Sequence, residues 1–494
     1  MIRTVGGPFC GWPNASVPAL LTILAATVAL RAWQVGEPLI GVDQQFYQLV
    51  GERMTGGLLP YRDVFDIKPP GIFALHYLMA ELLPKWPQAV EWLALLCAFA
   101  TSAIIHRIAR LRVSGAAAIA AAVLYLAYLP LFDGFGAQTP VIYNLFVAAA
   151  AWSCLALSAR GMADTRAAIL ACAPMLLMGL AIATKYMAMF EGAWFGLILL
   201  WRSREDGVGS GDLALRALCW AAVAFVPLAG ALLFYGTKGA AGAFVDANFL
   251  AVLRTGPATN VLKRLATTTA LLLPLLVLAG LARRRLTDHH REAGKDAALL
   301  VGWVALAVGG YLLFGTYLRH YALPLLVPLT VLAALGIERL GARRLGRATV
   351  AALVFVAITA GVVRFRDEAT EHGSAAQLTT LTRVTSPLVA HRCLYIFDGP
   401  PALYRTTGAC FATRFVFPQH LENVRFSAYP PRSQIDEIKR ILAQLPGAIV
   451  LGDAPLSQTS HSARTTLVAG LLARYRLAAT VRVGEARYQV WALR

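Results

Sequence analysis

The feature that most constrains this chain is a series of apolar stretches of about 17 to 22 residues, separated by short polar loops. Each stretch is long enough to cross the roughly 30 Å hydrocarbon core of a bilayer as a helix. Lipid offers no hydrogen-bond partner to the backbone, and a helix satisfies its backbone N–H and C=O groups internally. Barrel strands would alternate apolar and polar residues over about 10 residues, and these stretches do not. The expected spans are residues 17–35, 87–106, 115–131, 140–158, 167–185, 187–201, 216–235, 264–282, 297–315, 321–337 and 347–364.

Composition agrees with about eleven spans in a polytopic α-helical membrane protein. Hydrophobic residues make up 58% of the chain and charged residues only 15%, against about 25% charged residues in a soluble protein. The net charge of +18 is divided among clusters between the apolar stretches and does not form one continuous basic face. The expected partner is therefore the lipid bilayer, and no nucleic acid is expected.

The basic residues favour alternate loops, and this predicts the orientation of the chain. By the positive-inside rule the basic loops are cytoplasmic, so the N-terminus is expected in the cytoplasm. An odd number of spans then places the C-terminal segment outside. The basic loops hold Arg107, Arg110, Arg112, Arg160, Arg166, Arg202, Arg204, Arg216, Arg283–Arg285, Arg291, Lys295, Arg339, Arg343, Arg344 and Arg347.

Two domains are expected. Residues 1–365 form the transmembrane domain, which includes a long outer loop at 36–86 with an amphipathic stretch at 44–54 and a short apolar, interfacial or re-entrant helix at 71–83. Residues 366–494 form a small extracytoplasmic α/β domain, with strands expected at 393–397, 448–451, 480–483 and 488–492 and helices at 434–444 and 462–475. Cys393 and Cys410 in this domain either form a disulfide or remain buried thiols.

The outer loop 36–86 gathers side chains that can carry chemistry beside a rigid Pro69-Pro70 turn. For Asp63, which follows Arg62, an ordinary solvated ion pair is an equal alternative. The candidates in this loop are Asp43, Tyr47, Tyr61, Asp63, Asp66 and Lys68.

Two further polar groups are expected at the same outer face. Lys185 ends an apolar stretch, where a lysine usually faces a partner or a polar cavity, although snorkelling to the interface is the alternative. Arg319, His320 and Tyr321 lie between two strongly apolar stretches. Three cations, Lys68, Lys185 and Arg319, would suit a lipid-linked phosphate.

The segment Phe65-Asp66-Ile67-Lys68-Pro69-Pro70, with Asp43 and a Tyr four residues after it, resembles the first extracytoplasmic loop of GT-C glycosyltransferases. The resemblance is to the group of protein O-mannosyltransferases and lipid A aminoarabinose transferases. The segments 179–186 and 321–324 resemble their Thr-Lys and Tyr-Ile-Leu-Pro segments. This chain departs from the pattern where Gln44 replaces a common Glu, Phe46 replaces a common Arg, and Gln138-Thr139 replaces Thr-Glu.

The resemblance implies a membrane glycosyltransferase that moves a sugar from a polyprenyl phosphate to an acceptor in one inverting step on the periplasmic side of a bacterial inner membrane. Asp43 would act as the base, while Asp66 would orient the acceptor or share the proton. Lys68, Lys185, Arg319 and Tyr321 would hold the donor phosphate. Tyr47, Tyr61, Asp63, Gln138 and His320 are possible substrate contacts. No cofactor or metal is expected, and His289-His290 is interpreted as a solvated pair in a cytoplasmic loop.

Three alternatives remain at this point. A transporter or flippase of lipid-linked sugars would be expected to show internal repeats and broken helices near the midplane, and no convincing repeat is present. A polysaccharide ligase would carry its key residues in a late outer loop, whereas here the informative loop is the first. A structural subunit would leave Lys185 and the outer loop without a role.

Overall fold

The computed structural model describes the backbone of residues 16–281 and 291–494, and the side chains of these residues other than 291–295. The Arg283–Arg285 cluster, the His289-His290 pair and the beginning of the chain up to residue 15 lie outside the described residues. The basic side chains predicted at Arg291 and Lys295 lie outside them as well.

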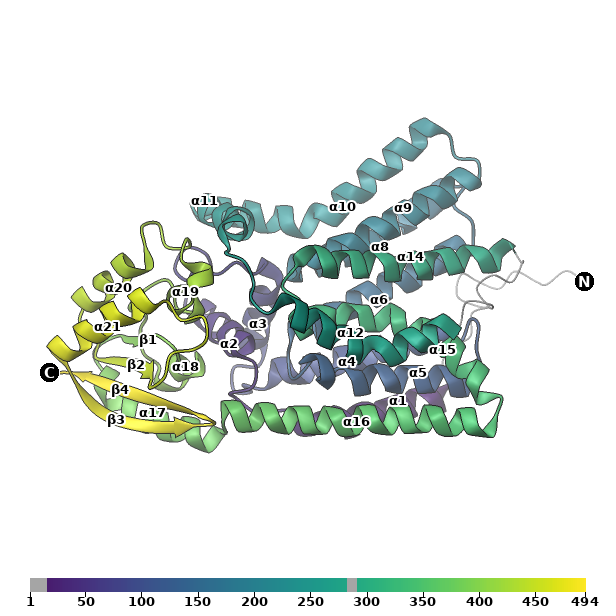
Figure 1. Cartoon of the computed structure of the whole chain (residues 1–494). Helices are drawn as coiled ribbons and strands as arrows, with labels where there is room; N and C mark the ends of the chain where they lie inside the picture. Colours follow the sequence, from purple (N-terminus) through teal and green to yellow (C-terminus); the bar gives the residue numbers. More distant parts are fainter. Residues whose placement is uncertain (1–15, 282–290) are drawn as a thin grey trace, which may run out of the picture.

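The first part of the chain is a bundle of long helices (Figure 1). Among the described residues, ten helical stretches are long and apolar enough to cross a membrane. The predicted span 187–201 forms one further helix, α9, which has 17 residues and packs beside α8, α10 and α14. The polytopic membrane fold is therefore confirmed. The helices of the bundle are α1 (Val17–Arg31), α4 (Ala89–Ala109), α5 (Gly115–Tyr128), α6 (Thr139–Ser158), α7 (Thr165–Leu170), α8 (Cys172–Thr184), α9 (Met189–Glu205), α10 (Ser210–Thr237), α12 (Val261–Leu281), α14 (Arg291–Phe314), α15 (Leu323–Gly341) and α16 (Arg344–His372).

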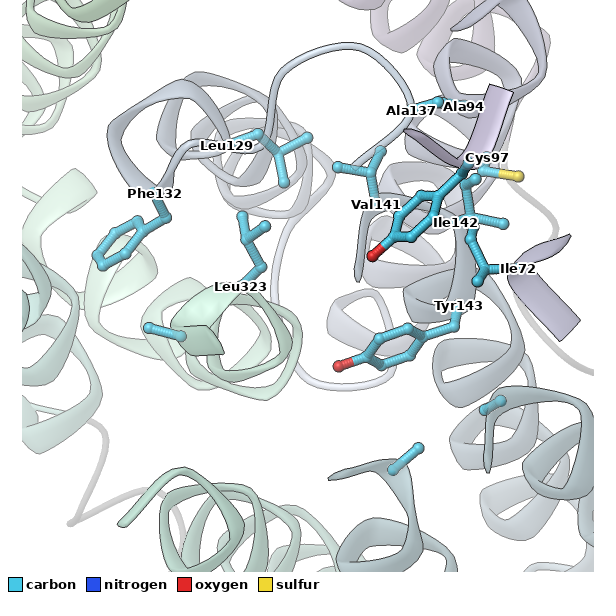
Figure 2. Close-up of a cluster of buried hydrophobic side chains, with 14 of the residues drawn as sticks. Ile72, Ala94, Cys97, Leu129, Phe132, Ala137, Val141, Ile142, Tyr143 and Leu323 are labelled. Carbon is cyan, nitrogen blue, oxygen red and sulfur yellow. The ribbon is translucent and has the colours of Figure 1, made fainter. Parts of the chain in front are cut away.

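Small residues let several of these helices approach closely. A Cβ atom at Gly179 on α8 would overlap the backbone of Ala224 on α10, and one at Gly336 on α15 would overlap the backbone of Leu278 on α12. Helices in lipid gain their packing energy from this kind of contact, because lipid tails are as apolar as the side chains. Helix α15 lies at the centre of the bundle with nearly every residue buried. Figure 2 shows the core around the start of this helix, where Leu323 lies among Leu129 and Phe132.

The outer loop 36–86 contains the two short helices expected from its sequence. Helix α2 (Val42–Met54) carries Asp43 in its first turn, and helix α3 (Pro70–Leu82) begins with a proline, which is favoured at the first helical position because its missing N–H would be unpaired there. The two helices pack on each other, and α3 also contacts α8. Figure 1 shows them between the spanning helices and the C-terminal domain.

The C-terminal domain is built on a four-stranded sheet of order β1-β2-β4-β3, in which β1 and β2 are parallel and β4 is antiparallel to both of its neighbours. All the expected strands and helices are present, and helices α17, α18 and α19 were not expected. Helix α16 continues through the predicted domain boundary at 365 and ends at His372. The elements are α17 (Ala375–Val389), β1 (Leu394–Ile396), α18 (Ala402–Thr407), α19 (Gln419–Glu422), α20 (Gln434–Ala443), β2 (Ala448–Gly452), α21 (His461–Arg474), β3 (Tyr475–Val483) and β4 (Ala486–Leu493).

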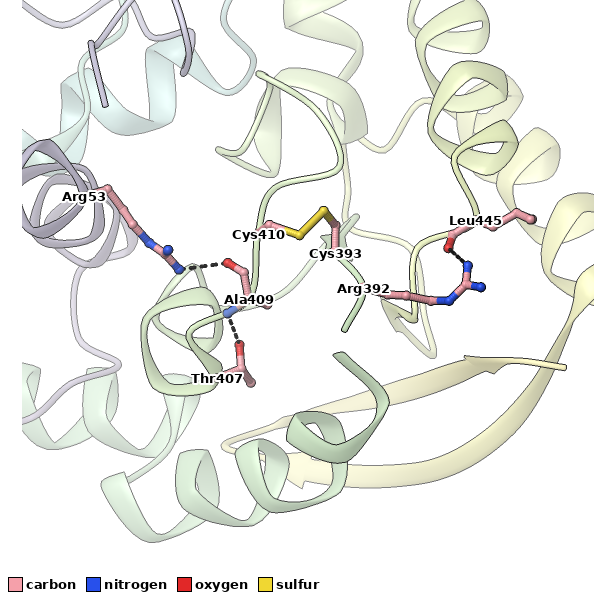
Figure 3. Close-up of a disulfide and its surroundings, with 7 residues drawn as sticks. All are labelled: Arg53, Arg392, Cys393, Thr407, Ala409, Cys410 and Leu445. Carbon is pink, nitrogen blue, oxygen red and sulfur yellow. Dashed lines mark hydrogen bonds between the residues drawn. A yellow bond between two sulfur atoms is a disulfide. The ribbon is translucent and has the colours of Figure 1, made fainter. Parts of the chain in front are cut away.

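Cys393 and Cys410 form a disulfide, which joins the start of β1 to the segment that follows α18 (Figure 3). Beside the disulfide, the guanidinium of Arg53 on α2 donates a hydrogen bond of 2.8 Å to the carbonyl oxygen of Ala409. The disulfide therefore stabilises a part of the C-terminal domain that contacts the outer loop.

Candidate functional site

The backbone around Lys68 is held by side chains of its own loop. A carboxylate oxygen of Asp66 accepts a hydrogen bond from the Lys68 N–H at 2.8 Å, and the Tyr61 hydroxyl donates one to the Lys68 carbonyl oxygen at 2.7 Å. Tyr61 has a φ of +68°, a conformation uncommon for residues other than glycine, and its ring is buried. Together with Pro69 and Pro70, these contacts fix where the Lys68 side chain begins.

Asp43 and Lys68 form an ion pair at the centre of the candidate site. The Lys68 Nζ lies 3.3 Å from a carboxylate oxygen of Asp43, and the two side chains are 18% and 21% exposed, respectively. Asp66 is only 2% exposed. The Asp43–Lys68 pair is therefore partly open to solvent, whereas Asp66 is buried.

A second cation approaches from the bundle. Lys185 directly follows α8, and its Nζ lies 4.4 Å from the centre of the Tyr321 ring. The ring of Tyr321 is 4.8 Å from that of His320. Lys68, His320 and Lys185 are all close enough to act on the charge of Asp43. The structure thus brings together Asp43, Lys68, Lys185, His320 and Tyr321, which come from three separate segments of the sequence.

Electrostatics keep the two exposed groups of this site charged. Burial by itself would raise the pKa of the Asp43 carboxyl, but the attraction of Lys68, His320 and Lys185 holds this pKa below its ordinary value. For Lys68, burial disfavours the charge, yet Asp43, Tyr47 and Asp66 together raise its pKa well above the usual value. Near neutral pH the site therefore holds a carboxylate beside an ammonium group.

Asp66 behaves differently because it is removed from solvent. Burial raises its pKa to about 6, although Lys68 and backbone N–H groups oppose the shift. The imidazole of His420, from the C-terminal domain, lies 3.8 Å from Asp66, and burial lowers the pKa of His420 to about 3. Near neutral pH, Asp66 therefore faces an uncharged histidine.

Other predicted site residues interact with groups outside the Asp43–Lys68 pair or are buried. Arg319 acts on the charge of Asp133 in the connection between α5 and α6. Asp63 accepts hydrogen bonds from the Leu59 N–H and from Arg62. These contacts agree with the ordinary ion pair that was the alternative to a substrate contact. Gln138 is buried at the start of α6.

Two predicted contacts have aromatic rings packed within the site. The Tyr47 ring is buried, and the Lys68 Nζ lies 5.5 Å from its centre. The Tyr61 ring packs against Phe73, Tyr235 and Phe244. Tyr47 therefore forms part of the wall around Lys68, and Tyr61 braces the loop.

The C-terminal domain supplies residues that sequence reasoning did not find. The ring of Phe417 lies 5.8 Å from the Lys68 Nζ, and His420 is buried against Asp66. The backbone of this segment is tied to the outer loop, because the Phe65 N–H donates to the Arg414 carbonyl oxygen at 2.8 Å. No pattern in the sequence links residues about 350 positions apart, so only the tertiary structure reveals this wall.

Two of the three departures from the GT-C sequence pattern, at Gln44 and Phe46, have local explanations. The Gln44 amide donates a hydrogen bond to the Phe135 carbonyl oxygen at 3.0 Å and accepts one from the Ala137 N–H at 2.9 Å. An ionised glutamate at this position has no donor for the first of these bonds. Phe46 is fully buried and its ring packs against Phe417 at 5.1 Å, so the position offers no place for a charged side chain.

Within residues 16–281 and 296–494, no three His, Cys, Asp or Glu side chains gather in a way that could hold a metal ion. Independence from metal stays a prediction.

No family model matches the chain, and no curated protein sequence matches it. Solved structures do. ArnT from Cupriavidus metallidurans in the apo state has a TM-score of 0.61 at 15% identity, over 95% of this chain and 97% of that one. The same protein bound to undecaprenyl phosphate gives 0.57 at 15% identity over 96% of each chain. The archaeal oligosaccharyltransferase AglB from Archaeoglobus fulgidus, in complex with an inhibitory peptide and a dolichol-phosphate, gives 0.56 at 10% identity over 94% of this chain and 79% of that one.

These similarities define the class of architecture: the chain is an integral membrane protein with the GT-C fold. The fold that the Asp43 to Pro70 segment predicted is thus confirmed over nearly the whole chain.

Proposed function

We propose that this protein is a glycosyltransferase that transfers a sugar from a polyprenyl phosphate to an acceptor in one inverting displacement. The observation that carries the proposal is the group formed by the Asp43 carboxylate and the Lys68 and Lys185 ammonium groups, at one end of a GT-C bundle. Two of the similar structures are described with undecaprenyl phosphate and dolichol-phosphate, which supports a lipid-linked donor.

Asp43 is the proposed base. The acceptor oxygen forms a bond to the anomeric carbon of the sugar while the bond from that carbon to the phosphate oxygen breaks. The hydroxyl proton passes to Asp43, which is suited to receive it because the surrounding cations keep its carboxylate ionised. Asp66 is proposed to orient the acceptor or share the proton, and its hydrogen bond to the Lys68 N–H supports a role in positioning Lys68 as well.

The cations are proposed to stabilise the leaving phosphate. It departs with the electron pair of the broken bond, and negative charge accumulates on it in the transition state. Lys68 and Lys185 both act on the charge of Asp43, and Tyr321, whose ring lies 4.4 Å from the Lys185 Nζ, is proposed as a hydrogen-bond donor beside them, together with Arg319. Lys68 would turn from Asp43 to the phosphate when the donor binds, which frees the carboxylate for the acceptor.

We place the protein in a bacterial inner membrane, with the N-terminus in the cytoplasm and the C-terminal domain in the periplasm. The alternation of basic loops supports this orientation. The Cys393–Cys410 disulfide supports it as well, since disulfides persist in oxidising compartments.

The test is transfer of radiolabelled sugar from a panel of polyprenyl-phosphate sugars by the purified protein in lipid, with an envelope extract as acceptor. We expect transfer from one of the donors, and its loss in both Asp43→Asn and Lys185→Ala. Near wild-type transfer by folded Asp43→Asn would refute the assignment of the base. No transfer from any donor, with folded protein and a competent extract, would favour a transporter or flippase of lipid-linked sugars.

A further inference from the structure

The opposite end of the bundle carries an apolar groove that the proposed reaction does not use. It has a volume of about 990 Å³, near the upper end of the range of about 300 to 1,000 Å³ typical of ligand pockets. Helices α5, α15 and α16 form its walls, and small side chains such as Ala120 and Ala351 leave the space between larger ones such as Phe355. Its outer wall is α16, whose Phe355 is 69% exposed, so hydrocarbon can enter the groove from the side of that helix.

One end of this groove is basic. Arg347 lines the groove in the first turn of α16, Arg344 begins that helix and Arg343 directly precedes it; these three residues are termed the basic turn. Arg347 is exposed, and no residue of the basic turn forms an ion pair with another side chain in the described part of the protein. The turn is held tight by Gly346, where a Cβ atom would overlap the backbone of Leu340. The backbone that carries these positive charges is thus held at the mouth of an apolar groove.

Glu338 also lines the groove, but its carboxylate does not neutralise the positive charge of the basic turn. Glu338 accepts hydrogen bonds from the Ser114 N–H at 3.2 Å and from the Ser114 hydroxyl at 2.5 Å. Its carboxylate is therefore engaged at the start of α5, where the helix dipole also favours negative charge. Arg347 remains available for a ligand.

We propose that this groove binds an anionic phospholipid of the surrounding bilayer, with acyl chains along α5, α15 and α16 and the phosphate at Arg347 and the basic turn. Basic pockets between spanning helices recognise anionic headgroups in this way, because the cation selects the phosphate and the apolar walls hold the chains. A zwitterionic lipid presents the same chains without the net negative charge. The site is separate from the proposed donor site, because the C-terminal domain and helices α2 and α3 lie at the other end of the bundle (Figure 1).

Native mass spectrometry of the purified full-length protein tests the proposal, with dioleoyl phosphatidylglycerol and dioleoyl phosphatidylcholine as probes. Each basic residue near a membrane surface adds about 1 kcal/mol of attraction for an anionic lipid. We therefore expect phosphatidylglycerol to bind more tightly, and Arg347→Ala to weaken it about fivefold without changing the binding of phosphatidylcholine. Arg204→Ala is the control, because it removes an exposed arginine from the last turn of α9, away from the groove.

A second pair of variants tests the groove itself. Ala351→Trp fills the space, whereas Ala352→Trp adds the same side chain at an exposed neighbour on α16 that does not line the groove. We expect only Ala351→Trp to abolish the tight phosphatidylglycerol adduct. Equal binding of the two lipids by wild-type protein, or tight phosphatidylglycerol binding by both Arg347→Ala and Ala351→Trp, would overturn the proposal. Sugar transfer is not part of these measurements, so their outcome is independent of the proposed function.

Discussion

At Gly71 the outer loop packs closely against the helical bundle. It lies in the first turn of α3, three residues after Lys68, and faces the end of α8, two residues before Lys185. A Cβ atom at Gly71 would lie 2.6 Å from the carbonyl oxygen of Ala183 and 3.0 Å from the Thr184 hydroxyl. This close approach brings Lys68 and Lys185 to the same site.

The change Gly71→Ala should therefore separate the two lysines. The new Cβ is about 0.8 Å short of the 3.4 Å at which ordinary contact begins, and its two nearest neighbours are backbone atoms of Ala183, which cannot rotate away. Overpacking of this kind costs about 1 to 3 kcal/mol of folding free energy. A displacement near 1 Å in a catalytic site lowers the rate by about 100-fold, and we expect a loss of this order in sugar transfer.

The assay is the sugar transfer described above, together with thermal unfolding of each purified variant. Gly56→Ala is the matched control, because the nearest atom to a Cβ there is the Arg53 carbonyl oxygen at 3.5 Å, an ordinary contact. We expect Gly56→Ala to keep wild-type transfer and Gly71→Ala to remain folded at a lower unfolding temperature. Full transfer by Gly71→Ala at wild-type stability would refute the argument that this contact sets the distance between the lysines.

Two further predictions concern stability. Burial raises the pKa of Asp66 in the folded protein to about 6, above its ordinary value of 3.8, so the folded protein holds this proton more tightly than the unfolded chain. Its contribution to the free energy of unfolding is therefore lost as the pH rises from about 4 to about 6, by about 3 kcal/mol. Asp66→Asn should remove this pH-dependent contribution, so the unfolding temperature of the variant should fall less than that of the wild-type protein between about pH 4 and about pH 6. The same fall in both proteins would contradict the raised pKa of Asp66. The Cys393–Cys410 disulfide closes a short loop, with a sequence separation of 17, and replacing both cysteines by serine should lower the free energy of unfolding by about 3 kcal/mol. A reductant should lower the unfolding temperature of the wild-type protein and leave that of the double serine variant unchanged. If the reductant shifts the unfolding temperatures of the two proteins equally, the disulfide does not contribute to stability.

The spans were predictable because each requirement for crossing a membrane is local. Length and hydropathy within one segment decide whether it can form a spanning helix. The short helices α2 and α3 and the four strands of the C-terminal domain follow the same logic, since a period of 3.6 or 2 residues is present in the segment itself. The boundary at residue 365 is different, because α16 continues as one helix to His372 without a break in its backbone.

The candidate site was predictable only in part. Asp43, Lys68 and Lys185 stand out in the sequence because charged residues beside apolar stretches are costly without a partner. That Lys68 pairs with Asp43 at 3.3 Å, while Arg319 lies toward Asp133, depends on how α3, α8 and α15 pack together.

The sequence by itself determined the class of this protein: a polytopic helical membrane chain with a GT-C outer loop and an α/β domain after the last span. The tertiary structure alone decided that Phe417 and His420 of this domain complete the wall around Lys68 and Asp66. The physical reason is that helix and strand formation depends on neighbours along the chain, whereas the contacts between these residues join surfaces that are hundreds of residues apart. Such surfaces meet only when the whole chain has packed.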